Sequence, residues 1–139
     1  MKIKNFALLA GVAGLLAACG GSSIVEPENL NDQRVFFGFN SAEINEEARN
    51  NLLGQSLYMK NHEDVKIQIA GNCDERGSTE YNLALGALRA GNAAHVIIQD
   101  GVESERIKTV SYGKGKPIYP GSGEEVWQKN RNATTRVKN

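Results

Sequence analysis

Few side chains in this sequence are of a type that performs covalent or metal chemistry: two cysteines, two histidines and a short acidic loop. Cys73 would act as a nucleophile only beside an activating base, and neither His62 nor His95 stands at a spacing that indicates such a pair. The histidines also lack the short spacing of metal ligands, so the sequence predicts no metal site. We interpret Cys73 as a small residue that fills a loop or packing position.

The acidic loop contains Asp74, Glu75 and Glu80. Carboxylates are the general acid and base of many hydrolases, so a hydrolase is one alternative. Acidic residues in a polar loop are usually solvated or involved in capping, however, and the sequence contains neither a metal triad nor a nucleophile with its base. We therefore expect that the protein is not an enzyme.

Cys19 stands where an apolar leader meets a polar segment. Lys2 and Lys4 give the leader its positive charge, residues 6–16 are almost entirely apolar, and small residues precede the cysteine. The apolar stretch is too short to span a bilayer. The pattern resembles a bacterial lipoprotein processing site, which predicts cleavage before Cys19 and acyl chains on that cysteine. The alternative is an ordinary secretory leader with a chance cysteine, and under either interpretation the protein leaves the cytoplasm.

Removal of residues 1–18 as a signal peptide would leave 14 basic residues against 16 acidic ones. This balance does not suggest a nucleic-acid partner, since nucleic-acid-binding domains usually carry a basic patch or a high isoelectric point. Residues 19–33 are rich in Gly, Ser, Asn and acidic side chains, which predicts a flexible tether. The remaining residues, 34–139, are enough for one folded domain.

Strand and helix patterns alternate along that domain in the order βαβαβ(α)β. Apolar runs and two-residue alternation predict strands at 34–39, 65–70, 107–112 and 133–137. Helical spacing of apolar residues predicts helices at 41–61, 79–99 and 124–129. The buried face of the second of these helices is predicted from residues on one stripe: Tyr81, Leu85, Leu88 and Val96.

Residues 71–86 have the sequence GNCDERGSTEYNLALG. Shorter motifs follow at Leu88-Arg89-Ala90, Gly101-Val102, Ser111-Tyr112-Gly113, Lys116-Pro117 and Asn130-Arg131. In this order and spacing, the motifs resemble the OmpA-like peptidoglycan-binding domain family. The match covers residues 35–137, which is essentially the whole folded domain. It implies an α+β fold with a mixed sheet and helices packed on one face.

The resemblance also implies a non-catalytic site for meso-diaminopimelate in the uncrosslinked stem peptides of peptidoglycan. The side-chain end of this amino acid carries an ammonium and a carboxylate on one carbon. Asp74 would pair with the ammonium, and Arg89 would offer its planar fork of donors to the carboxylate. The backbone at Gly38 would approach the ligand closely, and Asn40 and Arg131 are further candidates. We expect Asp74 and Arg89 at the surface, so that replacing either leaves the domain folded.

Some positions depart from the family pattern. An acidic residue is common at position 38 or 40 and a second arginine at position 132, where this sequence has Gly38, Asn40 and Asn132. Asn40 accepts hydrogen bonds but brings no charge to an ammonium. Residues 134–136 are polar where the family tends to have aliphatic side chains, which predicts an exposed edge strand of low stability.

For the whole protein, the resemblance implies an outer-membrane lipoprotein, anchored on the periplasmic face through Cys19 and linking that membrane to the cell wall. The partners that it implies are peptidoglycan and the Tol proteins, including the periplasmic β-propeller protein TolB, with roles in envelope integrity and cell division. It implies no cofactor. The alternatives are an OmpA-like lipoprotein that anchors another envelope machine, and a cell-wall hydrolase.

Overall fold

The computed structural model describes residues 23–138, so the predicted signal peptide and the lipidation site at Cys19 lie outside the described residues. The elements follow in the order β1 (Gln33–Phe36), α2 (Glu46–Asn61), β2 (Lys66–Asn72), α3 (Thr79–Gln99), the 3-10 helix η1 (Ser104–Arg106), β3 (Ile107–Gly113), α4 (Glu124–Asn130) and β4 (Asn132–Lys138). Helix α3 has the predicted bounds. Helix α2 begins later than predicted, because the side chain of Asn45 caps it by accepting a hydrogen bond from the backbone N–H of Ala48 at 2.8 Å.

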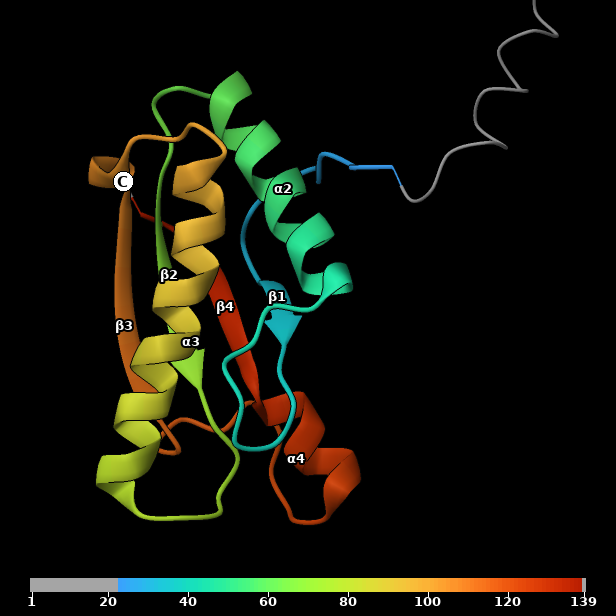
Figure 1. Cartoon of the computed structure of the whole chain (residues 1–139), viewed down its shortest axis with the longest axis vertical. Helices are drawn as coiled ribbons and strands as arrows, with labels where there is room; N and C mark the ends of the chain where they lie inside the picture. Colours follow the sequence, from blue (N-terminus) through green and yellow to red (C-terminus); the bar gives the residue numbers. More distant parts are fainter. Residues whose placement is uncertain (1–22, 139) are drawn as a thin grey trace, which may run out of the picture.

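The four strands form one mixed sheet in the order β1-β4-β2-β3 (Figure 1). Strand β4 pairs antiparallel with β1 and β2, while β2 pairs parallel with β3. Helices α2 and α3 lie side by side over one face of this sheet, and α4 lies at the end where β4 begins (Figure 1). The predicted α+β fold, with a mixed sheet and helices packed on one face, is confirmed.

Strand β4 lies inside the sheet, so the prediction that the polar last strand forms an exposed edge was wrong. Thr135 is buried, and its hydroxyl donates to Oε1 of Gln55 in α2 at 2.6 Å. On the opposite face, the Thr134 hydroxyl and the Asn72 amide both donate to Oδ1 of Asn132, at 2.8 and 2.9 Å. Polar side chains are accommodated in this central strand because neighbouring elements satisfy their hydrogen bonds.

The core lies between the sheet and the two long helices. Helix α3 approaches β2 so closely that a Cβ on Gly71 would lie 1.7 Å from the carbonyl oxygen of Gly86. Small residues therefore face the sheet in α3, and the predicted stripe is only half correct. Leu85 and Val96 are buried, whereas Tyr81 and Leu88 are exposed, Leu88 by 58%. The close approach also allows Arg89, about one turn after Gly86 in α3, to reach the Asn72 carbonyl at the end of β2. The candidate site lies there.

The segment before β1, predicted as part of a flexible tether, packs against the domain. Leu30 is fully buried. The backbone at Val25 lies against α2, where a Cβ on Gly54 would be only 2.2 Å from the Val25 carbonyl oxygen. The Asn61 amide donates to Oε1 of Glu26 at 3.0 Å. Residues from about 25 onward therefore contact the fold. Between residues 23 and 138, no helix has the length and apolar character needed to cross a membrane.

Candidate ligand-binding site

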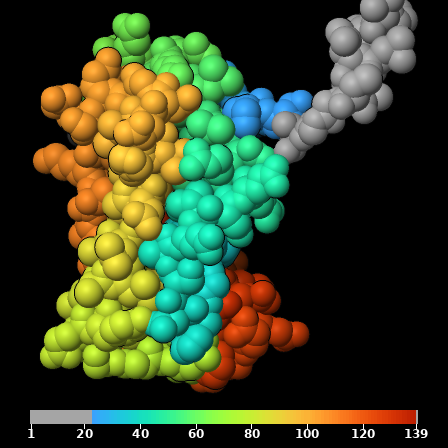
Figure 2. Space-filling model, viewed as in Figure 1, coloured from blue at the N-terminus to red at the C-terminus, as the bar shows by residue number. Residues whose placement is uncertain are grey.

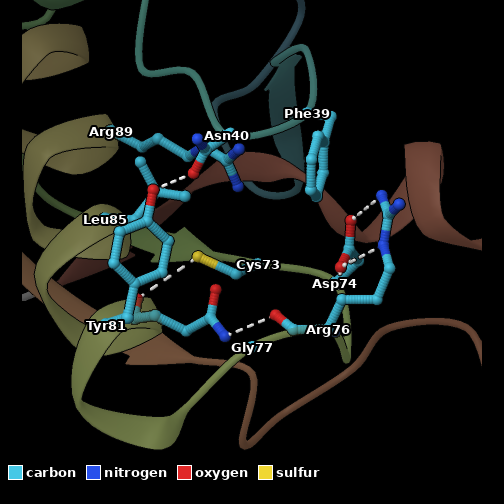
Figure 3. A pocket seen from close by; sticks show the side chains of 10 residues that line it. Phe39, Asn40, Cys73, Asp74, Arg76, Gly77, Tyr81, Leu85 and Arg89 are labelled. Carbon is cyan, nitrogen blue, oxygen red and sulfur yellow. Dashed lines mark hydrogen bonds and ion pairs between the residues drawn. The ribbon is translucent and has the colours of Figure 1, made fainter.

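A pocket of about 100 Å³ opens at the end of the sheet where β2 ends and α3 begins. In the space-filling view, the loop after β1 and the residues before and at the start of α3 meet at this lower end of the molecule (Figure 2). Three of the predicted site residues, Asn40, Asp74 and Arg89, line the pocket. Asn40 and Arg89 lie on one side of it and Asp74 on the other, with Cys73 between them (Figure 3). The pocket is lined by Phe39, Asn40, Cys73, Asp74, Arg76, Gly77, Tyr81, Asn82, Leu85 and Arg89.

Asp74 is only 4% exposed, which corrects the expectation of a surface carboxylate. The backbone N–H and Nε of Arg76 donate to its Oδ1 at 3.0 and 3.2 Å. Its Oδ2 accepts from Nη2 of Arg76 at 2.8 Å and from Nη1 of Arg131 at 3.4 Å. Burial works against the charged form, but the hydrogen bonds and charge of Arg76 outweigh it, so the pKa of Asp74 is lowered from 3.8. The carboxylate is therefore ionised at neutral pH, and two arginines saturate its acceptor positions.

Arg89 is 1% exposed, so the expectation of a surface position was wrong here as well. Its Nε donates to the Ser41 carbonyl at 2.8 Å, Nη1 to the Asn72 carbonyl at 2.9 Å, and Nη2 to the Gly38 carbonyl at 3.0 Å. All three partners are backbone carbonyls rather than carboxylates. Burial lowers the pKa of Arg89, but an arginine still keeps its charge in a protein. A positive charge is thus fixed at the pocket wall, and the same side chain ties the loop after β1 to β2.

Arg76 was not among the predicted site residues, yet it covers Asp74. Its guanidinium carbon lies 4.0 Å from the ring centroid of Phe39 and 3.9 Å from that of Trp127, so an aromatic ring stacks on each side. The Trp127 indole N–H donates to Oε2 of Glu75 at 2.8 Å, which fixes the outer ring. An arginine two residues after an aspartate indicates a local turn contact. The convergence of Phe39 and Trp127, however, follows only from the fold.

The other predicted residues take supporting positions. Asn40 has a φ of 60°, a left-handed conformation that asparagine tolerates, and its Oδ1 accepts from the Tyr81 hydroxyl. Arg131 is buried beside Asp74 and pairs with Glu124 through Nη2 and Oε2 at 2.8 Å. Gly38 does not line the pocket, and its contribution is the carbonyl that holds Arg89. Arg131 and Gly38 thus position the charged side chains rather than form the pocket wall.

Cys73 is a buried free thiol, and its Sγ donates to the carbonyl oxygen of Asn82 at 3.3 Å. Burial raises the pKa of this thiol, which disfavours the reactive thiolate. The position agrees with the interpretation of Cys73 as a packing residue. Across residues 23–138, His, Cys, Asp and Glu side chains form no group of three or more that could hold a metal ion.

The OmpA family model matches residues 36–131, a range that contains helices α2, α3 and α4, strands β2 and β3, and every residue that lines the pocket. The chain is 39% identical to the peptidoglycan-associated lipoprotein of Mesorhizobium japonicum over 136 residues, which cover 98% of this chain and 80% of that protein. The crystal structure of the peptidoglycan-associated lipoprotein from Burkholderia pseudomallei superposes with a TM-score of 0.74 at 37% identity, covering 76% of this chain and 90% of the other. The chain therefore belongs to the OmpA family and, within it, to the peptidoglycan-associated lipoproteins.

The fold alone is shared more widely. The C-terminal domain of Helicobacter pylori MotB superposes with a TM-score of 0.67 at 23% identity, and 86% of each chain is covered. At this identity, the similarity extends to the arrangement of the sheet and helices only.

Proposed function

We propose that this protein binds peptidoglycan without catalysis, through the ammonium and carboxylate at the free end of meso-diaminopimelate. The observation that carries the proposal is the charge of Arg89, which is buried at the pocket wall among backbone carbonyls. A buried charge is unfavourable unless it is paired. Of the five guanidinium N–H groups, three donate to these carbonyls, one from each nitrogen, and the Cys73 side chain also lies within hydrogen-bonding reach of Arg89. A ligand carboxylate bonded to Arg89 would place a counter-charge in direct contact with it, whereas the carboxylate of Asp74 acts on Arg89 without a hydrogen bond.

The ammonium of the same ligand group would bind on the Asp74 side of the pocket. Asp74 is ionised, and Oδ1 of Asn40 across the pocket accepts from the Tyr81 hydroxyl, so each side of the pocket carries a side-chain oxygen. Because Arg76 already occupies the acceptor positions of Asp74, an ammonium would compete with Arg76 for them. The Arg76 side chain is 32% exposed and has solvent into which it could move. We infer that ligand binding displaces the Arg76 guanidinium from Asp74.

The chemistry of the ligand offers a direct test that changes no residue of the protein. Cell wall that contains meso-diaminopimelate should retain the protein in a cosedimentation assay, whereas wall that contains lysine lacks the second carboxylate and should retain it weakly. Soluble meso-diaminopimelate should displace the bound protein, and lysine at equal concentration should not. Equal binding to both wall types would place the site elsewhere. Release of soluble wall fragments during the incubation would instead indicate a hydrolase.

We further propose that acyl chains on Cys19 anchor the protein to the periplasmic face of the outer membrane, so that it links that membrane to the wall. Support comes from the leader sequence and from relatives that are named lipoproteins. Several acyl chains anchor stably where one is marginal. Cys19→Ser should yield an unprocessed or mislocalised precursor without lipid label. A normally processed, membrane-bound form of that variant would contradict the proposal.

The partners that we propose besides peptidoglycan are the Tol proteins, in a system that supports envelope integrity and cell division. TolB is expected to bind the pocket end of the domain and to compete with the wall. This proposal rests on membership of the lipoprotein family. Soluble peptidoglycan fragments should therefore displace TolB in a pull-down, and simultaneous, independent binding of both would count against it. Gene neighbours that encode another envelope machine would favour the alternative assignment.

A further inference from the structure

The sheet face opposite the helices carries a cluster of positive side chains at one end. Lys66 of β2 lies directly opposite Lys138 of β4, and Gln68 lies between Arg136 of β4 and Lys108 of β3. Paired residues in adjacent strands project to the same face. Ile67 and Ile69 are buried in the core against the helices, so these alternate residues face away from the helices. We name Lys66, Lys108, Arg136 and Lys138 the basic face.

Most of this charge is not neutralised within the domain. Asp32 pairs with Arg136 at 2.9 Å, but Lys66, Lys108 and Lys138 form no ion pair with another described residue. All three lysines are exposed. Like charges directly opposite each other in a sheet are destabilising, and here Lys66 and Lys138 occupy such a pair. A groove of about 440 Å³ beside them adds Lys116 and the polar side chains of Gln68 and Tyr112 to the same surface. These like charges destabilise the isolated domain, and an anionic partner would neutralise them.

The path of the N-terminal segment indicates what lies next to the end of the sheet that carries the basic face. Glu26 is hydrogen-bonded to Asn61, at the end of α2 that leads into Lys66. Oδ1 of Asn31 accepts from the backbone N–H of Val137, the neighbour of Lys138. The N-terminal segment therefore enters the domain on the helix side of the sheet, at the same end as the basic face. The pocket lies at the opposite end of the sheet, near α4 and the loop after β1 (Figure 1).

The length of chain before the packed segment is short. Only four peptide steps separate Cys19 from Ser23, the first described residue, and they span at most about 14 Å. A lipid on Cys19 would thus hold the entry point of the domain close to the membrane surface, within roughly two screening lengths at physiological salt. The short link to Cys19 thus favours the membrane surface over a soluble protein as the partner of the basic face.

We propose that the basic face docks on anionic phospholipid headgroups of the membrane that holds the lipid on Cys19. The proposal rests on the proposed anchor for its biological setting, but the charge interaction itself needs no acyl chain. Each lysine or arginine at an anionic bilayer surface strengthens binding by about fivefold. With the basic face on the membrane, the pocket at the opposite end of the sheet would stay outside the docked surface.

The test uses the mature chain, residues 19–139, with Cys19→Ser, which retains every described residue of the fold. It should cosediment with vesicles that contain one third phosphatidylglycerol, not with vesicles of phosphatidylcholine alone, and added salt should release it. Combined replacement of Lys66, Lys108 and Lys138 by Gln should weaken this binding on the order of a hundredfold. A matched control replaces Arg49, Lys114 and Lys129, which lie toward the pocket end, by Gln and should bind as the parent does.

Three outcomes would overturn the proposal: equal loss in both triple variants, equal binding to neutral vesicles, or no binding to anionic vesicles. The last would leave an acidic protein as the partner of the basic face. Cosedimentation with cell wall should be the same for the parent and the Lys66, Lys108 and Lys138 variant. Failure of vesicle binding with intact wall binding would therefore reject this inference alone, whereas loss of wall binding by the parent would reject the proposed function.

Discussion

The two ends of the sheet hold their charges in opposite ways. At the pocket end, Asp74 and Arg131 are buried and joined to Arg76 and Glu124 in one chain of ion pairs. At the other end, the lysines of the basic face are exposed and form no ion pair with another described residue. Buried charges held by hydrogen bonds act only on a partner that matches their positions. Exposed charges act through solvent over roughly a screening length and discriminate little. The first arrangement suits one small zwitterion and the second suits a broad anionic surface.

The largest effect on folding stability that would test this contrast is expected from Arg89→Ala. Three backbone carbonyls, of Gly38, Ser41 and Asn72, would lose their donor inside the fold. We expect the free energy of unfolding to fall by about 3 kcal/mol, measured by urea denaturation. Arg49→Ala, at an exposed arginine, is the control and should change it by less than about 0.5 kcal/mol. An equally small change for Arg89→Ala would mean that Arg89 is not held as described.

Asp74→Asn removes the charge of the pocket carboxylate and keeps its shape. The amide oxygen still accepts from the backbone N–H of Arg76, so the fold should persist by circular dichroism. Binding to meso-diaminopimelate wall should weaken by about 2–5 kcal/mol, tens- to thousands-fold, because the ligand ammonium loses its counter-charge. Retention of full affinity in a folded variant would show that Asp74 does not contact the ligand.

The same carboxylate predicts the acid limit of stability. Because the folded pKa of Asp74 is lowered from its ordinary 3.8, ionised Asp74 stabilises the fold at any pH above that value. This contribution is lost as the pH falls below 3.8 through the folded pKa. Thermal unfolding from pH 7 to pH 2 should therefore show a steeper loss below about pH 4 in the parent than in Asp74→Asn. Parallel curves for the two proteins would contradict the ion pairing described at this end.

Arg76→Ala should tighten wall binding, since it removes the group that competes with the ligand for Asp74. We expect a gain of at least about tenfold, because one hydrogen bond to a charged group contributes about 1.5–3 kcal/mol. Arg76→Lys, which keeps a cation, should gain less. Weaker binding by Arg76→Ala would mean that Arg76 holds the ligand instead of giving way to it.

The smallest effect concerns the basic end. Lys66→Glu would place opposite charges across the β2–β4 pair in place of Lys66 and Lys138. Stability should rise by about 0.2–1 kcal/mol, while binding to anionic vesicles falls. A control at Lys129, away from the sheet, should show no such gain when changed to Glu. A loss of stability with Lys66→Glu would show that the two lysines do not face each other.

Local patterns in the sequence were sufficient to predict the order of helices and strands. The burial of side chains and the composition of the two charged surfaces depend on contacts between distant segments. Helix α3 was predicted with its final bounds from the helical spacing of its apolar residues, and the structure shows that Ser78 caps its start. The burial of Asp74 and Arg89 was missed, because charged side chains are normally exposed and the carbonyls that accept from Arg89 come from distant segments. The basic face was also hidden, since the overall charge is balanced and only the strand register brings its lysines together.

The central position of the last strand has a consequence for how this protein acquires its structure. Among the strands that the structure describes, β1 pairs with β4 alone, and the paired residues Arg34 and Thr134 are 100 positions apart. Contacts so distant along the chain form slowly, because a long loop must close before they stabilise anything. The sheet cannot be completed until β4 has been synthesised. If the proposed leader directs the chain through a membrane from its N-terminus, the sheet would therefore stay incomplete until β4 has crossed.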